Sequence, residues 1–490
     1  MARMERPRSG MSGMSGESGA ASPAPNRSRE PLAAALSLAE RSRVRSIDEL
    51  ARLVRLPSLT GEEGPAQQHI AERLTEIGAE VTVAEPDVRS MFQAYPSIAQ
   101  YPTHWQHDLI LPYDDLPTYA ALSESGLETV LNYRGRPNVV GRVAGTGGGR
   151  SLILNGHIDT VTIEPRASWT RDPFGAEVVD GMMYGRGTSD MKGGLMAALM
   201  ALTYLKEAGV RLKGDVVLQS VVNEEHAGNG TLDLVRRGCT ADAAIVLEPT
   251  NNTVAVSHPG GLYWQVTVPG TQRSPGARWQ NGRQDGVSAI EKIPAVIQAL
   301  LGLERAYNSK RNDDPMEKGR MPFSLVIGKI AGGHYETVTA GDTTIKGGAY
   351  FAPATGDIVE IMDGFRKAVA EANEGDEFLR EHPAKIEFLH HDDSTRQSPQ
   401  LPLARYLGEV LSKEGGNGTP VPGPFCCDMR HLVNQGNIPT VIFGPGTIAQ
   451  AHKPDEHIQL AEYLESIDYL IRFIGQWCNE SRDSGPAIRF

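Results

Sequence analysis

The sequence has few cysteines, no surplus of basic residues and no long apolar run, and each absence excludes a class of protein. Its 490 residues include four cysteines, which lack the spacing of a zinc knuckle and are too few for a disulfide scaffold. The formal net charge of -12 leaves no basic surplus to meet phosphates. No apolar run approaches the roughly 20 residues that a membrane-spanning helix needs. We therefore expect no nucleic-acid partner and no membrane partner.

Two regions of the chain have little pattern of their own. Residues 1–31 are rich in Ser, Gly, Pro, Met and Arg and lack the apolar segment of a secretory signal. We interpret them as a disordered tail, or as the product of a start codon placed too far upstream, and we expect a cytoplasmic protein. Residues 88–128 carry four Tyr, a Trp and several Pro, and we predict an irregular insertion that shapes a pocket wall or an interface.

Four short apolar runs each lead into residues that can bind a metal ion. Runs rich in Val, Ile and Leu and bounded by Gly, Pro or Asn are typical of strands in a parallel sheet, buried on both faces. Ligands bind such sheets beyond the carboxyl ends of the strands, so these polar residues are expected to converge. Each apolar run is followed by its candidate ligands: residues 151–155 by His157 and Asp159, residues 215–222 by Glu224 and Glu225, residues 243–247 by Glu248, and residues 438–443 by His452.

The order of predicted elements indicates an α/β protein with an insertion. Strands and helices alternate across 138–256, which is typical of a mostly parallel sheet with flanking helices. From Leu262 the strands alternate between polar and apolar residues, as half-exposed strands do. We predict a catalytic metal-binding domain made of 32–258 and 394–490, interrupted by an inserted α+β lid or dimerisation domain at 259–393.

The candidate ligands have the composition of a site for two metal ions. A pair of divalent transition ions needs His nitrogens and carboxylates, one of them shared, and a position for water. Asp159 is placed to orient His157, and Glu224 is placed to act as a general base. Each residue also has a structural alternative: a lone Glu after a strand is more often a solvated loop residue, and Asp190 also fits a helix N-cap.

Five ordered motifs resemble a known enzyme family. The chain is similar to the dinuclear zinc amidohydrolases and peptidases that include acetylornithine deacetylase, succinyl-diaminopimelate desuccinylase, aminoacylase and glutamate carboxypeptidase. The resemblance extends from about residue 35 to the C-terminus and looks closest to the acetylornithine deacetylase branch. The motifs are Gly156-His-Ile-Asp-Thr160, Gly185-Arg-Gly-Thr-Ser-Asp-Met-Lys-Gly-Gly194, Asn223-Glu-Glu-His-Ala-Gly-Asn-Gly-Thr231, Leu247-Glu-Pro-Thr250 and Ala451-His-Lys-Pro-Asp-Glu456.

The resemblance implies roles for these residues and a cofactor. Two zinc ions per subunit are expected, with cobalt or manganese as alternatives, and Glu224 is implied to be the general base that serves a bridging water. The substrate is expected to be a small N-acyl or peptide-like amide, and the protein a homodimer through strand 262–268 and helix 286–307. In the implied ligand set Asp190 bridges the ions, His157 and Glu248 complete one site, Glu225 and His452 complete the other, and Asp159 orients His157.

The inserted domain departs from the family pattern. Ser274 stands where relatives carry a His that contacts the transition-state oxyanion, and the loss of one such donor typically costs about 10²–10³ in turnover. The Arg that many relatives use to bind a substrate carboxylate is missing from 346–351. In one interpretation, His334 or His258 supplies the missing donor. In a second, the substrate has no free α-carboxylate.

Three other functions stay open at this point. A dipeptidase or carboxypeptidase would need a carboxylate clamp that this lid does not visibly offer. A metal-retaining binding protein would hydrolyse little or nothing, and a repurposed enzyme would use the same metals for another reaction. The intact Glu224 favours a hydrolase over a metal-retaining binding protein, because a pure binding role gives no reason to keep an unliganded carboxylate beside the metals.

Overall fold

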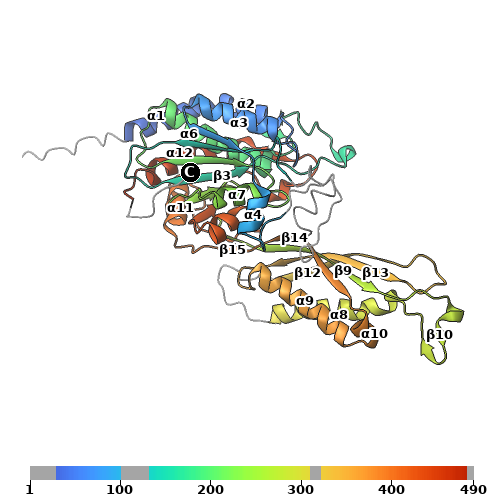
Figure 1. The fold of residues 1–490 in the computed structure, drawn as a ribbon. Helices are drawn as coiled ribbons and strands as arrows, with labels where there is room; N and C mark the ends of the chain where they lie inside the picture. The colour runs from blue at the N-terminus through green and yellow to red at the C-terminus, as the bar shows by residue number, and fades with distance from the viewer. Residues whose placement is uncertain (1–28, 101–131, 310–321, 483–490) are drawn as a thin grey trace, which may run out of the picture.

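The computed structural model describes residues 29–100, 132–309 and 322–482, and they form two units, each with its own sheet (Figure 1). The larger unit holds a six-stranded sheet, and the smaller unit holds a four-stranded sheet. Their hydrophobic cores are made of different residues. The strand β9 (Gly260–Pro269) leads into the smaller unit, and β14 (Lys385–Asp392) is its last strand.

The six-stranded sheet has the order β1-β2-β6-β3-β7-β16. Four neighbouring strands, β6, β3, β7 and β16, run parallel, while β1 and β2 are antiparallel to their neighbours. This confirms the predicted mostly parallel sheet, and each of the four apolar runs named above overlaps one of its strands. The bounds are β1 Glu80–Ala84, β2 Asn138–Val143, β3 Leu152–His157, β6 Val216–Val221, β7 Ala244–Val246 and β16 Thr440–Ile442.

Helices cover both faces of this sheet. Alternate residues of each strand point to opposite sides, and apolar side chains on both sides need to be buried. In β3, Leu152 and Leu154 pack into one core, whereas Ile153 packs into the other. The first core contains α6, whose Gly194 lies so close to the sheet that an added Cβ would meet the Leu247 carbonyl oxygen at 1.9 Å. The helices are α1 Arg29–Arg41, α2 Arg43–Val54, α3 Gly64–Glu76, α4 Val88–Ala94, α6 Gly193–Glu207, α7 Asn229–Arg236, α11 Pro402–Lys413 and α12 Leu460–Trp477.

The smaller unit is an antiparallel sheet of order β12-β13-β9-β14 with helices on one face. Leu262 and Trp264 of β9 are fully buried against these helices. Because β9 lies between β13 and β14, the strand expected to contact a second copy has no free edge. The remaining elements of the unit are β12 Phe323–Gly332, β13 Asp342–Phe351, α8 Ala289–Ser309, α9 Ile358–Glu374 and α10 Glu377–Glu381.

Short strands and turns complete the described chain. They form a three-stranded sheet of order β17-β5-β4 and two strand pairs. No helix in the described ranges has both the length and the apolar character needed to cross a bilayer. The short strands are β4 Glu177–Val179, β5 Met182–Tyr184, β8 Ser257–His258, β10 Trp279–Gln280, β11 Arg283–Gln284, β15 Thr395–Arg396 and β17 His457–Gln459.

At the start of the described chain, the helices α1 and α2 meet at Ser42. One sequence-based prediction of local structure is wrong. The segment expected to be irregular from residue 88 begins with α4, which Asp87 caps by accepting a hydrogen bond from the Ser90 amide. Most of the expected tail and of the expected insertion, residues 1–28 and 101–128, lies outside the described residues.

Candidate metal centre

The carboxyl edge of the parallel strands brings the predicted site residues together. His157 is the last residue of β3, Glu224 and Glu225 follow β6, and Glu248 follows β7. Asp190 lies in the turn Thr188–Lys192, directly before α6. His452 lies in the loop between β16 and β17, in a left-handed conformation with φ of 60°. All of these side chains come from strand ends or from loops beside them, as the parallel topology predicts.

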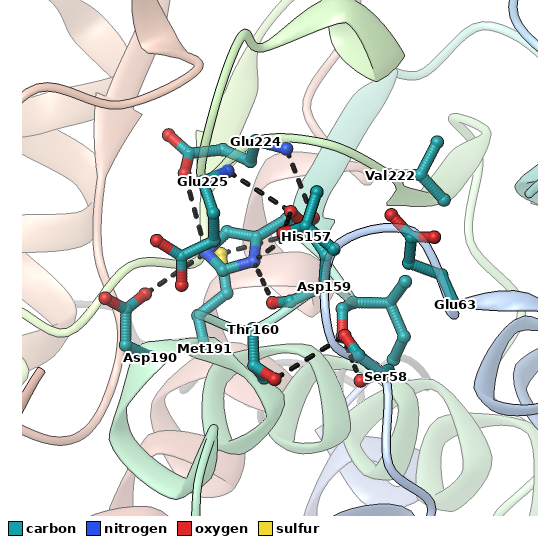
Figure 2. Close-up of polar contacts among 12 residues, drawn as sticks. Ser58, Glu63, His157, Asp159, Thr160, Asp190, Met191, Val222, Glu224 and Glu225 are labelled. Carbon is teal, nitrogen blue, oxygen red and sulfur yellow. Dashed lines mark hydrogen bonds and ion pairs between the residues drawn. The ribbon is translucent and has the colours of Figure 1, made fainter. Parts of the chain in front are cut away.

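The carboxylate of Asp190 faces an imidazole on each side. Its Oδ1 lies 3.1 Å from His157 Nε2, and its Oδ2 lies 3.6 Å from His452 Nε2. His452 Nε2 also lies 2.9 Å from Glu225 Oε2. Figure 2 shows Asp190, Glu225 and His157 turned toward one another. One carboxylate thus presents a different oxygen to each of two histidines.

Two further glutamates lie near the same nitrogen of His157. Glu248 Oε1 lies 3.7 Å from His157 Nε2, and Glu224 Oε2 lies 3.9 Å from the same nitrogen. Two overlapping groups keep one ligand atom of each member within 4.8 Å of the others: His157 with Glu224 and Glu248, and His157 with Asp190 and Glu225. Distance alone therefore allows Glu224 to be a ligand as well as a base.

Asp159 holds both His157 and the glutamate loop in place. His157 Nδ1 lies 2.9 Å from the main-chain oxygen of Asp159 and 3.7 Å from its Oδ1, so the main chain rather than the carboxylate is the nearer partner. The carboxylate instead accepts hydrogen bonds from the amides of Glu224 and Glu225, at 3.1 and 3.2 Å, and from Thr60 Oγ1 at 2.9 Å. Asp159 thereby ties the end of β3 to the residues after β6 (Figure 2).

Glu456, which belongs to the last of the five motifs, positions Asp190. Its side chain is fully buried, and Oε1 accepts hydrogen bonds from the amides of Ser189 and Asp190, at 2.9 and 3.1 Å. Its Oε2 accepts from the Gly187 amide at 3.1 Å and from Arg186 at 2.7 Å. The motif alone assigns Glu456 no role, and the available signal is its place four residues after His452 and four before α12.

Tyr133 shapes the backbone directly before Glu224, and the sequence analysis gave it no role. Its hydroxyl donates a hydrogen bond of 2.5 Å to Asn223 Oδ1. Asn223 has a φ of 65°, a left-handed conformation that Asn adopts more readily than most residues. The Arg136 guanidinium lies over the Tyr133 ring at 4.8 Å and forms a buried bidentate pair with Glu63. This network fixes the direction in which the chain leaves β6.

The ionisation of the cluster reflects crowded carboxylates in a buried place. Burial raises the pKa of Glu224 and of Glu248 well above the usual range of glutamate, and neighbouring carboxylates add to the rise. Burial also opposes the charged form of His157, but Asp190 and the glutamates outweigh it and raise the pKa of His157 well above its usual value. Four carboxylates face two imidazoles here, so the cluster carries more negative charge than its own histidines can neutralise.

The donor set fits a pair of divalent cations. Ligand atoms on one tetrahedral zinc ion lie about 3.3 Å apart, given bonds of about 2.0–2.1 Å. The contacts of 2.9 to 3.7 Å among the Asp190, His157, His452, Glu225 and Glu248 atoms are of this size. Four carboxylates also balance the charge of two divalent cations. Nitrogen and oxygen donors without thiolate suit zinc, cobalt or manganese.

The residues weighed as substitutes for the missing lid histidine lie in different environments. Ser274 is exposed and precedes a short turn, residues 275–277. His334 is exposed and lines a cavity of about 540 Å³ between that turn and the loop 332–340. His258 is fully buried, and burial lowers its pKa to about 4. His258 therefore has no surface with which to contact a substrate, whereas His334 does.

Comparisons with known proteins agree with this fold and site. The family model described as "Peptidase family M20/M25/M40" matches residues 153–476. An N-formyl-4-amino-5-aminomethyl-2-methylpyrimidine deformylase of Halalkalibacterium halodurans is 31% identical over 368 residues, which cover 71% of this chain and 84% of the relative. A probable succinyl-diaminopimelate desuccinylase of Staphylococcus aureus is 28% identical over 357 residues, covering 68% and 84%.

Solved structures share the fold at lower sequence identity. A tripeptidase from Staphylococcus aureus superposes with a TM-score of 0.63 at 18% identity, covering 89% of this chain and 99% of the other. A Bacillus subtilis protein described as a dinuclear metal-binding peptidase from the M20 family gives a TM-score of 0.56 at 14% identity, covering 89% and 98%. The relatives named above are hydrolases of C–N amide bonds. The chain therefore belongs to peptidase family M20/M25/M40 and is a hydrolase of C–N amide bonds.

Proposed function

We propose that the protein removes the acyl group from a small N-acyl amine, with two divalent cations held by the strand-end cluster. In this proposal His157 and Glu248 hold one cation, Glu225 and His452 hold the other, and Asp190 lies between them. The two oxygens of Asp190, each facing a different imidazole, are the observation that carries this assignment. A carboxylate with such contacts is suited to bridging two ions.

Glu224 is the general base of the proposed reaction. It has the longest of the contacts to His157, at 3.9 Å, and both of its neighbours in the chain, Asn223 and Glu225, are held in place by side chains. When bound, the two cations supply a water of lowered pKa and polarise the amide carbonyl. Glu224 accepts the proton that this water loses as it attacks the carbonyl carbon. When the C–N bond breaks, Glu224 returns the proton to the departing amine nitrogen.

The supporting residues keep these groups in their reactive positions. Asp159 holds the main chain of Glu224 and Glu225, and Glu456 holds that of Asp190. Because all of these contacts go to backbone amides, they fix the backbone position of each residue. They leave the charge of its side chain unchanged. Such preorganisation is what a site of this kind needs before the substrate arrives.

A deacylase is better supported than a dipeptidase or carboxypeptidase. The similar proteins named above that align over most of their length at 28–31% identity are a deformylase and a probable desuccinylase. The likeness to peptidase structures lies at 13–19% identity and speaks for the fold alone. The segment 346–351, where many relatives carry a carboxylate-binding Arg, has none. An acyl amine without an α-carboxylate is consistent with that sequence.

Three finer statements belong to the same proposal. Zinc is the expected native metal, because the donors are imidazoles and carboxylates. A homodimer is expected through the smaller unit, whose described edge strands are β12 and β14, with Val326 and Ile330 of β12 exposed. A cytoplasmic location is expected as well. Metal analysis of the purified protein, sedimentation velocity and cell fractionation test the three in turn.

Turnover by the zinc-loaded protein and its Glu224→Gln variant tests the function. The substrates are N-formyl, N-acetyl and N-succinyl amines with and without a carboxylate. Wild-type protein is expected to hydrolyse at least one of them, and the variant to retain the metals with kcat lowered by roughly 10²–10⁴. An exposed glutamate on α12 gives the matched control, Glu465→Gln, which should leave kcat unchanged. Wild-type turnover no faster than that of Glu224→Gln would exclude hydrolysis at this site.

A further inference from the structure

The open face of the smaller sheet carries exposed aromatic side chains that the proposed reaction does not use. Tyr263 of β9 and Tyr350 of β13 are 51% and 46% exposed. The register pairs Tyr263 with Gly348 and Tyr350 with Gly261, so all four residues lie on one face of the sheet. This face is opposite to the one that buries Trp264 against the helices. Gly348 leaves backbone partly exposed beside the Tyr263 ring, whereas Gly261 beside Tyr350 is buried.

His390 of β14 extends this aromatic surface. It is the cross-strand partner of Tyr263, and the two ring centroids lie 5.2 Å apart. His390 Nε2 lies 3.0 Å from Asp392 Oδ2, and Asp392 in turn pairs with Arg430 at 2.8 Å. These contacts hold the imidazole in one orientation. We call the surface formed by Tyr263, Tyr350, His390 and the two glycines the tyrosine slot.

The tyrosine slot is linked by close contacts to the loop that carries Glu224. Asp392, the partner of His390, pairs with the buried Arg430 at 2.8 Å. A Cβ added to Gly228, four residues after Glu224, would meet Arg430 Nη2 at 2.7 Å. Arg430 therefore lies against both the slot and the loop of the proposed general base.

The chemistry of the slot favours a flat, uncharged ring. Tyrosine and imidazole faces stack on aromatic groups, and glycine beside them lets a ring approach the sheet closely. The Asp392 carboxylate next to His390 adds a hydrogen-bond acceptor, which suits an amino substituent better than a carboxylate. Tyr350 itself lies in the segment 346–351, where a carboxylate-binding Arg is missing.

We propose that the tyrosine slot binds an aromatic ring on the amine side of the substrate, so that the enzyme acts on N-acyl amines built on a flat heterocycle without a carboxylate. The inference rests on the proposed function, because that reaction places the scissile amide beside Glu224. The deformylase of Halalkalibacterium halodurans is named for an aminopyrimidine, a ring of this class.

Matched substrates that differ only in the ring test the proposal by kinetics. N-formylbenzylamine and N-formylcyclohexylmethylamine have rings of similar size, and only the first is aromatic. Zinc-loaded wild-type protein should prefer the aromatic substrate in kcat/KM by about tenfold. Tyr263→Leu and Tyr350→Leu should each lower that preference about 3- to 10-fold, while leaving the rate on the cyclohexyl substrate within about twofold.

Two variants control for other effects on the sheet. Tyr350→Phe keeps the ring and should keep the preference, even though it loses the hydroxyl. Val359 is exposed on α9, one of the helices that cover the opposite face of the sheet, and Val359→Ala should change nothing. A wild-type enzyme that hydrolyses both substrates equally well, or leucine variants with an unchanged preference, would overturn the slot and leave the proposed function standing.

Calorimetry tests ring binding by the tyrosine slot independently of turnover. The probes are 4-amino-5-aminomethyl-2-methylpyrimidine and, as the saturated control, cyclohexylmethylamine. The pyrimidine should bind the wild-type protein more tightly than the control does, and each leucine variant should weaken it about 3- to 10-fold. Equal binding by wild-type protein and both variants would overturn the slot, even if no amide in the kinetic panel is hydrolysed and the proposed function has failed.

Discussion

The metal centre of the larger unit and the tyrosine slot of the smaller unit differ in how their side chains are held. At the centre, Asp190 and Glu248 are nearly fully buried, and Asp159 and Glu456 bind the backbone around the ligands. In the slot, the side chains are half exposed and stand beside glycines. Bond cleavage needs atoms at set positions, whereas the choice of substrate can be changed by one exposed ring. The two regions can therefore vary independently.

Removal of the metals should have the largest effect and should separate the two regions. Dialysis against a chelator is expected to lower kcat by roughly 10³ or more, because no other group polarises the carbonyl or activates water. Added zinc should restore it. Binding of the aminopyrimidine by the metal-free protein should still depend on Tyr350, as Tyr350→Leu calorimetry will show. A metal-free protein that keeps its turnover would contradict the assignment of the centre.

Glu456→Gln should weaken the metal centre without touching a ligand. The substitution keeps the size of the side chain but removes the charge that holds Arg186 and the amides of Ser189 and Asp190. Loss of such an outer partner typically lowers metal affinity about 10- to 100-fold. Breaking a buried ion pair costs about 3–5 kcal/mol of unfolding free energy.

Competition with a zinc chelator and thermal denaturation measure these two effects. The exposed Glu465→Gln variant serves as the reference. The aromatic preference of the slot should survive in Glu456→Gln protein, because no contact links Glu456 to β9 or β13 among the interactions described here. Unchanged metal affinity together with an unchanged melting temperature would show that Glu456 neither positions the metal ligands nor stabilises the fold.

Mild acid should loosen the junction between the two units. His258 precedes β9, and His431 lies beside Arg430; burial lowers their pKa values to about 4 and about 3. Arg430 lowers both values further, while Asp392 partly opposes it. An unfolded chain protonates each histidine below about pH 6.5, so between pH 6.5 and 4 the unfolded state binds more protons. The contribution of these histidines to the free energy of unfolding therefore falls as the pH is lowered. The loss is at most about 1.4 kcal/mol per pH unit for each histidine.

Urea unfolding of metal-free protein at pH 7.5 and pH 5.5 tests this slope. His258→Leu removes one of the titrating groups and should reduce the difference between the two conditions. An equal change in stability with pH in wild-type and His258→Leu protein would show that His258 does not contribute to this slope. A steeper loss in the variant than in the wild-type protein would contradict the assignment to His258.

Tyr133→Phe should have the smallest effect. It removes the hydroxyl that bonds Asn223 and leaves the ring under Arg136. The loss of one buried hydrogen bond lowers the free energy of unfolding by about 1 kcal/mol. It should also lower kcat modestly, because the residue before Glu224 gains conformational freedom. Chemical denaturation and steady-state kinetics measure the two. An effect on KM with kcat unchanged would indicate that Tyr133 contacts the substrate and does not position Glu224.

The convergence of the candidate ligands could be predicted because these residues follow a simple topological rule. His157, Glu224 and Glu248 each come at or just after the end of a buried parallel strand, and such ends meet at one edge. Strand 262–268 and helix 286–307 of the smaller unit were also placed to within a few residues of β9 and α8, because their apolar residues recur with a clear period.

Contacts between distant parts of the chain could not be predicted. Glu456 reaches Ser189 across 267 residues, and Tyr133 reaches Asn223 across 90, and no local pattern marks either pair. The break between α1 and α2 at Ser42 interrupts an otherwise helical composition. The tyrosine slot depends on the register between β9 and β13, which places Tyr263 and Tyr350 on one face only once the strands are paired.

Metal stoichiometry tests the central claim most directly. Zinc bound per chain should be measured for wild-type protein, Asp190→Asn and Glu224→Gln, with Asp180→Asn, an exposed carboxylate, as the control. The account predicts two zinc ions for wild-type, Glu224→Gln and Asp180→Asn proteins, and fewer than two for Asp190→Asn, because Asp190 is shared by both ions and Glu224 by neither. One ion or none in the wild-type protein, or the loss of an ion in Glu224→Gln, would contradict it.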